Sequence, residues 1–193
     1  SFSLKGNWND EFENNHPIIL ELGCGKGEYT VELARRNPKK NYIGIDIKGS
    51  RIWKGAQIST QENLKNIRFL RTQIEFLEKC FSKHEVEEIW ITFPDPHIKY
   101  RRRKKRLISP SFLNSYKRII AKNGLIHLKT DSEFLHGYTL GVLQNIDSEI
   151  IRSTHDLYYH NHADDSVLSI KTFYESMFLK KNKAITYICF KLI

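Results

Sequence analysis

The chain has 193 residues, of which 40% are hydrophobic and 27% charged, and this predicts one soluble globular domain spanning residues 1–193. No apolar run approaches the roughly 18 residues that cross a bilayer. The three cysteines, Cys24, Cys80 and Cys189, form no C-x-x-C pair, which argues against a disulfide framework or a zinc ribbon and favours the reducing cytoplasm. Lys and Arg total 31 against 22 Asp and Glu, for a net charge of +9. We therefore expect a polyanionic partner, although excess charge also serves solubility.

The first predicted unit is a buried strand that runs through a glycine-rich turn into a helix. The apolar run Ile18–Leu22 has strand length and is interrupted only by Glu21, which is typical of a strand buried on both faces of a parallel sheet. A helical pattern follows over Glu28–Arg36. A ligand held at such a turn meets backbone N–H groups and the positive end of a helix, so the unit predicts a nucleotide-like ligand at the carboxyl end of the strand.

The spacing of the glycines narrows the choice of ligand. Gly23, Gly25 and Gly27 give the pattern E-x-G-x-G-x-G, which fits neither the dinucleotide fingerprint G-x-G-x-x-G nor a P-loop. It is similar to motif I of methyltransferases that use S-adenosylmethionine (SAM). The alternative is a tight turn whose glycines serve packing alone.

A second strand closes on an acidic residue. Tyr42–Asp46 is apolar up to its last position, and a helix is expected over Gly49–Asn63. In doubly wound sheets an acidic residue at this place hydrogen-bonds ribose hydroxyls, so we expect this role for Asp46. The alternative is that Asp46 caps the helix that follows it.

Further along the chain, apolar runs and helical patterns keep alternating. Ser109-Pro110 marks a helix start and Asn123-Gly124 its end. Seven strands and intervening helices predict an α/β fold with a mainly parallel sheet. The additional strands are expected at 67–71, 88–93, 125–129, 149–153 and 184–192, and the additional helices at 75–81, 111–121, 133–145 and 171–180.

A carboxylate follows the strand at 88–93. Asp95 stands between Pro94 and Pro96, and the two prolines stiffen the backbone around it. By the topology of such sheets this position lies at the ligand-binding edge, so Asp95 is the candidate for an active-site carboxylate. An ordinary Asp-Pro turn is the alternative.

A basic run begins four residues after Asp95. Lys99–Arg106 contains one uncharged residue, Tyr100, and no acid, so it favours a polyanion such as RNA, with Arg101, Arg102 and Arg103 as the phosphate-binding candidates. A solvated loop or a targeting signal is the alternative. Its position beside Asp95 favours a nucleic-acid substrate.

Two weaker signals complete the survey. Asp131 ends the strand at 125–129 and is placed either at the ligand edge or as the cap of the next helix. The segment 155–165 carries His155, His160 and His162 with two aspartates, but its spacing fits no standard zinc pattern, so we expect no metal.

These motifs together resemble the tRNA (guanine-N7)-methyltransferase family. The matching residues run in family order from Glu21 to Glu175: E-L-G-C-G-K-G, then G-I-D-I at 44–47, F-P-D-P at 93–96 with Lys99, K-R-L at 105–107, K-T-D at 129–131 and T-F-Y-E at 172–175.

The resemblance implies a Rossmann-like class I fold with helices on both faces of the sheet, and a SAM-dependent methyl transfer to N7 of a guanine in the tRNA variable loop. Carried over by position, Glu21, Asp46 and Gln73 contact SAM beside the glycine turn, and Asp95 is the active-site carboxylate at the cofactor. The substrate contacts implied are Lys99, Asp131, Thr172, Tyr174 and Glu175.

The sequence departs from the family pattern at two places. His97 and Ile98 replace the usual Trp and Pro after F-P-D-P, and Gln73 replaces an acidic residue near the adenine. A histidine still stacks on a base and an amide still hydrogen-bonds adenine. A SAM enzyme acting on another RNA or DNA base, and a noncatalytic RNA-binding subunit, stay open as alternatives, as do a monomer and a homodimer.

Overall fold

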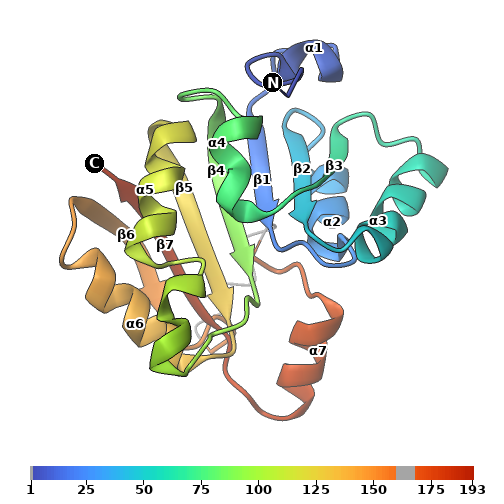
Figure 1. Ribbon diagram of the computed structural model, residues 1–193. Helices are drawn as coiled ribbons and strands as arrows, with labels where there is room; N and C mark the ends of the chain where they lie inside the picture. Colours follow the sequence, from blue (N-terminus) through green and yellow to red (C-terminus); the bar gives the residue numbers. More distant parts are fainter. Residues whose placement is uncertain (1, 160–167) are drawn as a thin grey trace.

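The computed structural model describes residues 2–159 and 168–193, and its centre is one seven-stranded sheet (Figure 1). The strand order is β3-β2-β1-β4-β5-β7-β6, with neighbours parallel from β3 to β5 and β7 antiparallel to both of its neighbours. The mainly parallel α/β sheet expected from the sequence is thereby confirmed. The strands are β1 Ile18–Leu22, β2 Asn41–Asp46, β3 Ile67–Arg71, β4 Val86–Thr92, β5 Ile120–Thr130, β6 Ser148–Thr154 and β7 Thr186–Leu192.

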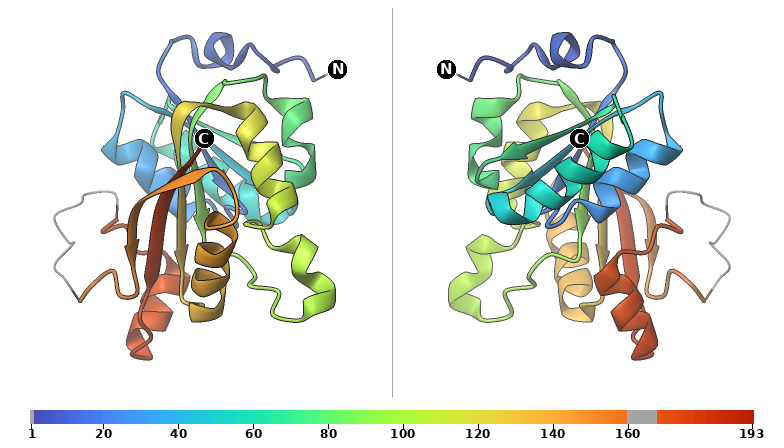
Figure 2. Two further views of the ribbon diagram at one scale, coloured as in Figure 1. Left: turned by 90° about the vertical axis from the view of Figure 1, so that its left-hand side faces the viewer. Right: turned by 90° about the vertical axis from the view of Figure 1, so that its right-hand side faces the viewer.

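Helices cover both faces of the sheet (Figure 2). Because β1 is fully buried, its alternate side chains feed two cores: Leu20 and Leu22 pack with residues of α1, α4, α5 and α6, while Ile19 packs with α2. The helices are α1 Trp8–Phe12, α2 Glu28–Arg36, α3 Gly49–Gln61, η1 Ile74–Phe76, α4 Leu77–Cys80, η2 Tyr100–Lys105, α5 Pro110–Ile119, α6 Glu133–Leu143 and α7 Phe173–Lys180, where η marks a 3₁₀ helix.

Two segments extend past the carboxyl ends of the parallel strands. Figure 2 shows η2 and α7 at this edge on opposite sides of the sheet, while α1 lies at the other end. Such a sheet binds its ligands outside the carboxyl ends of its strands. The two segments therefore stand on either side of the expected site.

The largest difference from the predicted boundaries is at the junction of α5 and β5. Asn123-Gly124 does not end the helix, because α5 stops at Ile119 and β5 starts immediately at Ile120. The pair lies in a bulge of β5, where the partners of Val86 and Glu88 on β4 jump from residue 120 to residue 125. Asn123 has φ +68°, and a Cβ on Gly124 would lie 2.7 Å from a backbone oxygen of β4, so the turn residues were recognised but assigned to the wrong element.

Two short helices lacked a sequence signal. We expected only packing contacts from the N-terminal segment, and Trp8 and Phe12 of α1 do lie in the core. No helix was predicted within the basic run, which forms η2. No helix within the described ranges is both long and apolar enough to cross a membrane.

Candidate functional site

The glycines of the turn differ in what surrounds them. Gly23, Gly25 and Gly27 all have left-handed backbones, with φ between +56° and +74°. A Cβ on Gly27 would lie 2.6 Å from the ring of Phe69, so this glycine is needed for packing. A Cβ on Gly25 would meet nothing within 4 Å. Packing therefore accounts for the third glycine, whereas the second leaves free space beside the turn.

Asp46 ties the turn to the end of β2. One carboxylate oxygen accepts a hydrogen bond from the Gly25 N–H at 3.0 Å and the other from the Lys48 N–H at 2.8 Å. The N-cap of α3 is Lys48, so the alternative assignment of Asp46 as the cap of this helix is wrong. Asp46 as a residue is 8% exposed, and it lines a hollow.

Two adjoining hollows lie beside the glycine turn, at the carboxyl ends of the parallel strands, and share Gly23. The first is a cavity of about 210 Å³. The second lies toward β2 and β3. The first is lined by Glu21, Gly25, Tyr29, Arg51, Phe93, Thr172 and Tyr174, among others, and the second by Asp46, Gln73, His97, Lys105 and Leu107, among others.

Glu21 forms the floor of the first hollow. Its carboxyl group accepts hydrogen bonds from the hydroxyls of Thr30 and Thr92, the latter at 2.6 Å. Burial raises the pKa of Glu21 from 4.5 to about 7, although the two hydroxyls oppose the shift. The group is therefore poised to gain or lose a proton near neutral pH, and a cation bound in the hollow favours its ionised form.

A third hollow adjoins the first and shares Phe93 and Tyr174 with it. Asp95 and Asp131 both line this space. Ser132 rather than Asp131 accepts the capping hydrogen bond of α6, so the capping alternative for Asp131 is wrong. Asp131 instead forms an ion pair of 3.3 Å with Lys183. The structure thus brings together the two aspartates that the sequence placed 36 positions apart.

Asp95 belongs to a wall that we call the arm, residues 93–107. Its side chain is 66% exposed, and its carboxylate accepts a hydrogen bond from the His97 N–H at 2.9 Å and lies 3.4 Å from the ring Nδ1 of His97. His97 faces the second hollow while Asp95 faces the third. The arm is therefore a wall shared by both spaces.

The basic run within the arm divides into exposed and buried cations. Lys99, Arg101 and Arg102 are exposed. Arg103 is half-buried, with its guanidinium 4.0 Å from the centroid of the Tyr100 ring. Arg106 is 5% exposed and points into the protein. The expectation of one continuous RNA-facing run is therefore wrong at its last residue, because Arg106 bonds the arm itself.

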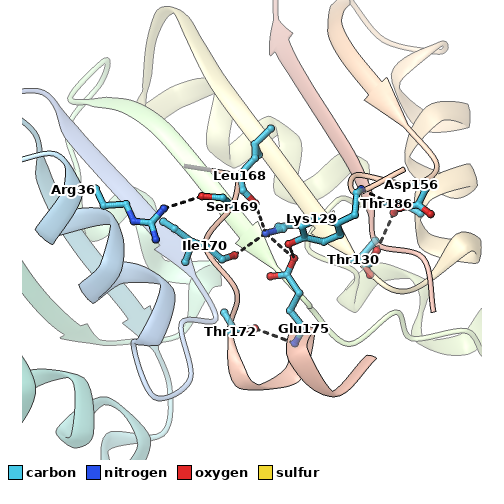
Figure 3. A network of polar contacts seen from close by, with 11 residues as sticks. Arg36, Lys129, Thr130, Asp156, Leu168, Ser169, Ile170, Thr172, Glu175 and Thr186 are labelled. Carbon is cyan, nitrogen blue, oxygen red and sulfur yellow. Dashed lines mark hydrogen bonds and ion pairs between the residues drawn. The ribbon is translucent and has the colours of Figure 1, made fainter. Parts of the chain in front are cut away.

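The opposite wall is the strap, residues 168–175, which leads into α7. Lys129 of β5 donates hydrogen bonds to the carbonyls of Leu168 and Ile170 at 3.0 and 2.9 Å, and forms an ion pair of 2.8 Å with Glu175 (Figure 3). The Tyr158 hydroxyl donates to the same Glu175 oxygen. The ammonium and carboxylate have no exposed surface.

This burial corrects the direct substrate contact predicted for Glu175. A carboxylate with no exposed surface cannot reach a substrate in this structure, and it holds the strap instead. No role was predicted for Lys129, because a single lysine at the end of a strand does not indicate that it will pair with a residue 46 positions later. The K-T-D and T-F-Y-E motifs were the only signals that touched both.

The other strap residues reach the hollows to different degrees. Thr172 caps α7 by accepting from the Glu175 N–H and lines the first hollow, not the third. Tyr174 is 56% exposed and lines both. The strap is also fixed to α2, because the Phe173 N–H donates to Glu28 at 2.8 Å and Arg36 donates to Ser169 at 2.9 Å. Figure 3 shows the second of these anchors.

No group of three or more His, Cys, Asp or Glu side chains suited to a metal occurs among residues 2–159 and 168–193. Of the histidine-rich segment, His160, His162 and both aspartates lie outside the described residues. The expectation of no metal therefore stays a prediction.

Residues 15–188 match the family model described as "Putative methyltransferase". A tRNA (guanine-N(7)-)-methyltransferase of Christiangramia forsetii is 57% identical, over 99% of this chain and 86% of the relative. One of Porphyromonas gingivalis is 49% identical, over 99% of this chain and 78% of the relative. The chain belongs to the tRNA (guanine-N7)-methyltransferase family.

The fold of this family member is also found in proteins of much lower sequence identity. The crystal structure of the 16S rRNA methyltransferase KamB superposes with a TM-score of 0.73 over 98% of this chain and 93% of the other, at 14% identity. At this identity the likeness shows the fold alone. It agrees with the Rossmann-like class I architecture expected from the sequence.

Proposed function

We propose that this chain methylates N7 of a guanine in the tRNA variable loop, with S-adenosylmethionine as the methyl donor and S-adenosylhomocysteine as the product. Membership of the family supports this, and so does one observation: three adjoining hollows follow the carboxyl edge of the sheet, and Asp95 lines the last of them. The reaction belongs to the cytoplasm and is carried out by a monomer or a homodimer.

The residues at the first two hollows suit the donor. Asp46 offers a carboxylate to ribose hydroxyls, Gln73 an amide to the adenine, and the glycine turn a backbone without a Cβ. Glu21 lies below the first hollow and complements a cation there. When bound, S-adenosylmethionine supplies an electrophilic methyl group on a sulfonium.

The chemistry asks little of the protein beyond alignment and charge compensation. Guanine N7 is a lone pair that carries no proton, so no general base is needed to free it. Positive charge arrives on the guanine ring, and a nearby carboxylate lowers the energy of that change. Asp95 supplies this carboxylate and accepts a hydrogen bond from the N1–H or the exocyclic amine of the base, while Asp131 lines the same hollow.

The tRNA is held on both sides of the third hollow. Lys99, Arg101 and Arg102 on the arm, with the half-buried Arg103, offer charge to the phosphates. Tyr174 on the strap offers an exposed ring on which a base stacks. Thr172 contributes to the wall of the adjoining hollow.

One experiment tests the whole assignment. The protein is incubated with S-adenosylmethionine and unmodified tRNA, and the RNA is treated with borohydride and aniline, which cleave the chain at 7-methylguanosine. We expect one enzyme-dependent cleavage in the variable loop. Methyl incorporation without that cleavage would assign the activity to another base, and no incorporation together with intact tRNA binding would favour a noncatalytic RNA-binding subunit.

A further inference from the structure

Arg106 ends the basic run, but it is buried, at 5% exposure. Its Nε donates to the carbonyls of Pro96 and His97, both at 3.3 Å, and its Nη2 donates to those of His97 and Ile98 at 3.1 and 3.3 Å. Three consecutive carbonyls next to Asp95 thus converge on one guanidinium. A planar fork with five N–H donors suits such a group.

The other side of the guanidinium lies on aromatic rings of α6. The carbon at its centre is 4.3 Å from the centroid of Tyr138 and 4.8 Å from that of Phe134. No carboxylate of the described residues forms an ion pair with Arg106, and the guanidinium is permanently charged. Carbonyl dipoles and ring faces therefore balance this charge, and they do so only while residues 96–98 keep their carbonyls turned inward.

The arm needs such a constraint because its backbone is strained. Phe93 and His97 have left-handed φ angles of +48° and +42°, which residues other than glycine adopt only when their surroundings impose it. Pro94 and Pro96 have no N–H with which to hold the turn. The His97 N–H bonds to Asp95, so the strained residue and the carboxylate are parts of one arrangement.

We propose that Arg106 is a positioning residue for the methyl transfer: it holds residues 95–98 in the conformation that directs Asp95 to the substrate hollow and His97 to the cofactor hollow. This role rests on the proposed function, because it gives the arm its purpose. It separates Arg106 from Arg101 and Arg102, whose exposed charges serve RNA binding.

The discriminating variant is Arg106→Lys, which keeps the charge but removes the fork and the flat surface that stacks. The matched control is Arg118→Lys on α5, the same change at an exposed residue paired with Glu78 outside the site. We expect kcat of Arg106→Lys on tRNA to fall by about 10²-fold, the loss typical of a displaced reactive group. KM for tRNA and the dependence of tRNA binding on salt stay as in the wild type.

The kinetic outcome distinguishes the two roles. An unchanged kcat with a raised KM and a shallower salt dependence would make Arg106 one more RNA contact and overturn the proposal. An unchanged kcat and KM would overturn it as well. The control is expected to match the wild type in both parameters.

A second measurement does not need activity. Hydrogen exchange followed by mass spectrometry reports on the His97 amide, which we expect to exchange faster in Arg106→Lys and at the wild-type rate in Arg118→Lys. Equal exchange in all three proteins would overturn the positioning role, whether or not the wild type is active on tRNA. Inactivity of the wild type on tRNA would refute the proposed function but not this role. If Arg106→Lys does not fold, Tyr138→Leu, which removes part of the ring surface at a half-buried position, is judged by the same two measurements.

Discussion

The arm and the strap are two walls of one site, and each is held by a single buried cation. Lys129 lies in β5, far from the strap in the sequence, whereas Arg106 belongs to the arm that it holds. Both donate to backbone carbonyls of an irregular segment: Lys129 to those of Leu168 and Ile170, and Arg106 to those of residues 96–98. They differ in how their charge is balanced: Lys129 has the carboxylate of Glu175, while the partners of Arg106 among the described residues are carbonyls and aromatic rings.

Because of this difference, we expect the two cations to affect different properties: Lys129 the stability of the domain, and Arg106 the geometry of the arm. A buried ion pair gains little over a well-packed apolar pair, but losing one member leaves the other charged and without solvent. Carbonyl groups released from a cation find water or other donors at lower cost, particularly at a molecular surface. Loss of Lys129 should therefore affect the whole domain, whereas loss of Arg106 should affect the local position of Asp95.

The largest expected effect is on the strap. Lys129→Met leaves the fully buried Glu175 carboxylate facing an apolar side chain, and we expect the free energy of unfolding to fall by about 3–5 kcal/mol. Urea denaturation measures this loss. The double variant Lys129→Met/Glu175→Gln removes the unpaired charge as well, so it should be more stable than the single variant.

The double variant also tests the mechanism. If it is no more stable than Lys129→Met, the unpaired charge is not the cause, and the carbonyl contacts of the strap are what Lys129 contributes. The Tyr158 hydroxyl, which donates to Glu175 in the wild type, keeps an acceptor in Glu175→Gln because the amide oxygen takes that place.

The strap and the arm also differ in how far the sequence could predict them. The strand Ile18–Leu22 and the place of Asp46 at the end of β2 were predicted correctly, because a short apolar run and a strand-terminal acid are local signals. The burial of Glu175 in α7 was not predictable in this way, since it depends on Lys129 in β5. Helical and strand patterns describe a residue's neighbours along the chain and carry no information on pairs formed by folding.

Arg106 shows a second limit of prediction from the sequence. In the sequence it is the last of several cations, and composition treats them alike. The structure separates it from Arg101 and Arg102 because a 3₁₀ helix, which had no sequence signal, turns the chain back toward Pro96. The general position of the site was therefore predictable, while the division of labour among its charged residues was not.

The next largest effect is expected from Glu21, which lies between the arm and the strap, on the pH dependence of stability. The pKa of Glu21 is raised from 4.5 to about 7, so the folded protein holds this proton more tightly than the unfolded chain. Its contribution to stability is complete below pH 4.5 and is lost as the pH rises through 7, a change of about 3 kcal/mol. Glu21→Gln should remove this part of the pH dependence, as measured by urea denaturation between pH 4.5 and 8.

Glu21 also links the cofactor to pH. A bound cation favours the carboxylate, so S-adenosylmethionine should bind more tightly as the pH rises through 7 and should release protons below it. Calorimetry in buffers of different ionisation enthalpy counts these protons. If wild type and Glu21→Gln release the same number, the cofactor does not interact with this carboxyl group.

On the arm itself, removing a charge without changing shape isolates the role of Asp95. Asp95→Asn should lower kcat by about 10²-fold, as expected for a preorganised group that stabilises developing charge. The affinity for S-adenosylmethionine should stay as in the wild type, because Asp95 lines the third hollow only. Asp147→Asn, at an exposed turn between α6 and β6, is the matched control. Wild-type single-turnover rates in Asp95→Asn would remove this residue from the chemistry.

The smallest effect per residue is expected from the exposed cations of the arm. Replacing Arg101 and Arg102 with Gln should weaken tRNA binding and flatten the slope of log K against log salt concentration by up to about 0.9 for each phosphate that the protein no longer neutralises. The control removes the same charge elsewhere, with Lys83 and Lys122 changed to Gln; both are exposed, and each belongs to a turn or bulge outside the three hollows. If both double variants change the slope equally, the tRNA responds to the net charge of the molecule rather than to this wall. A flatter slope in the arm variant alone, with kcat preserved at saturating tRNA, would place RNA binding on the outer face of the same segment whose inner face Arg106 holds.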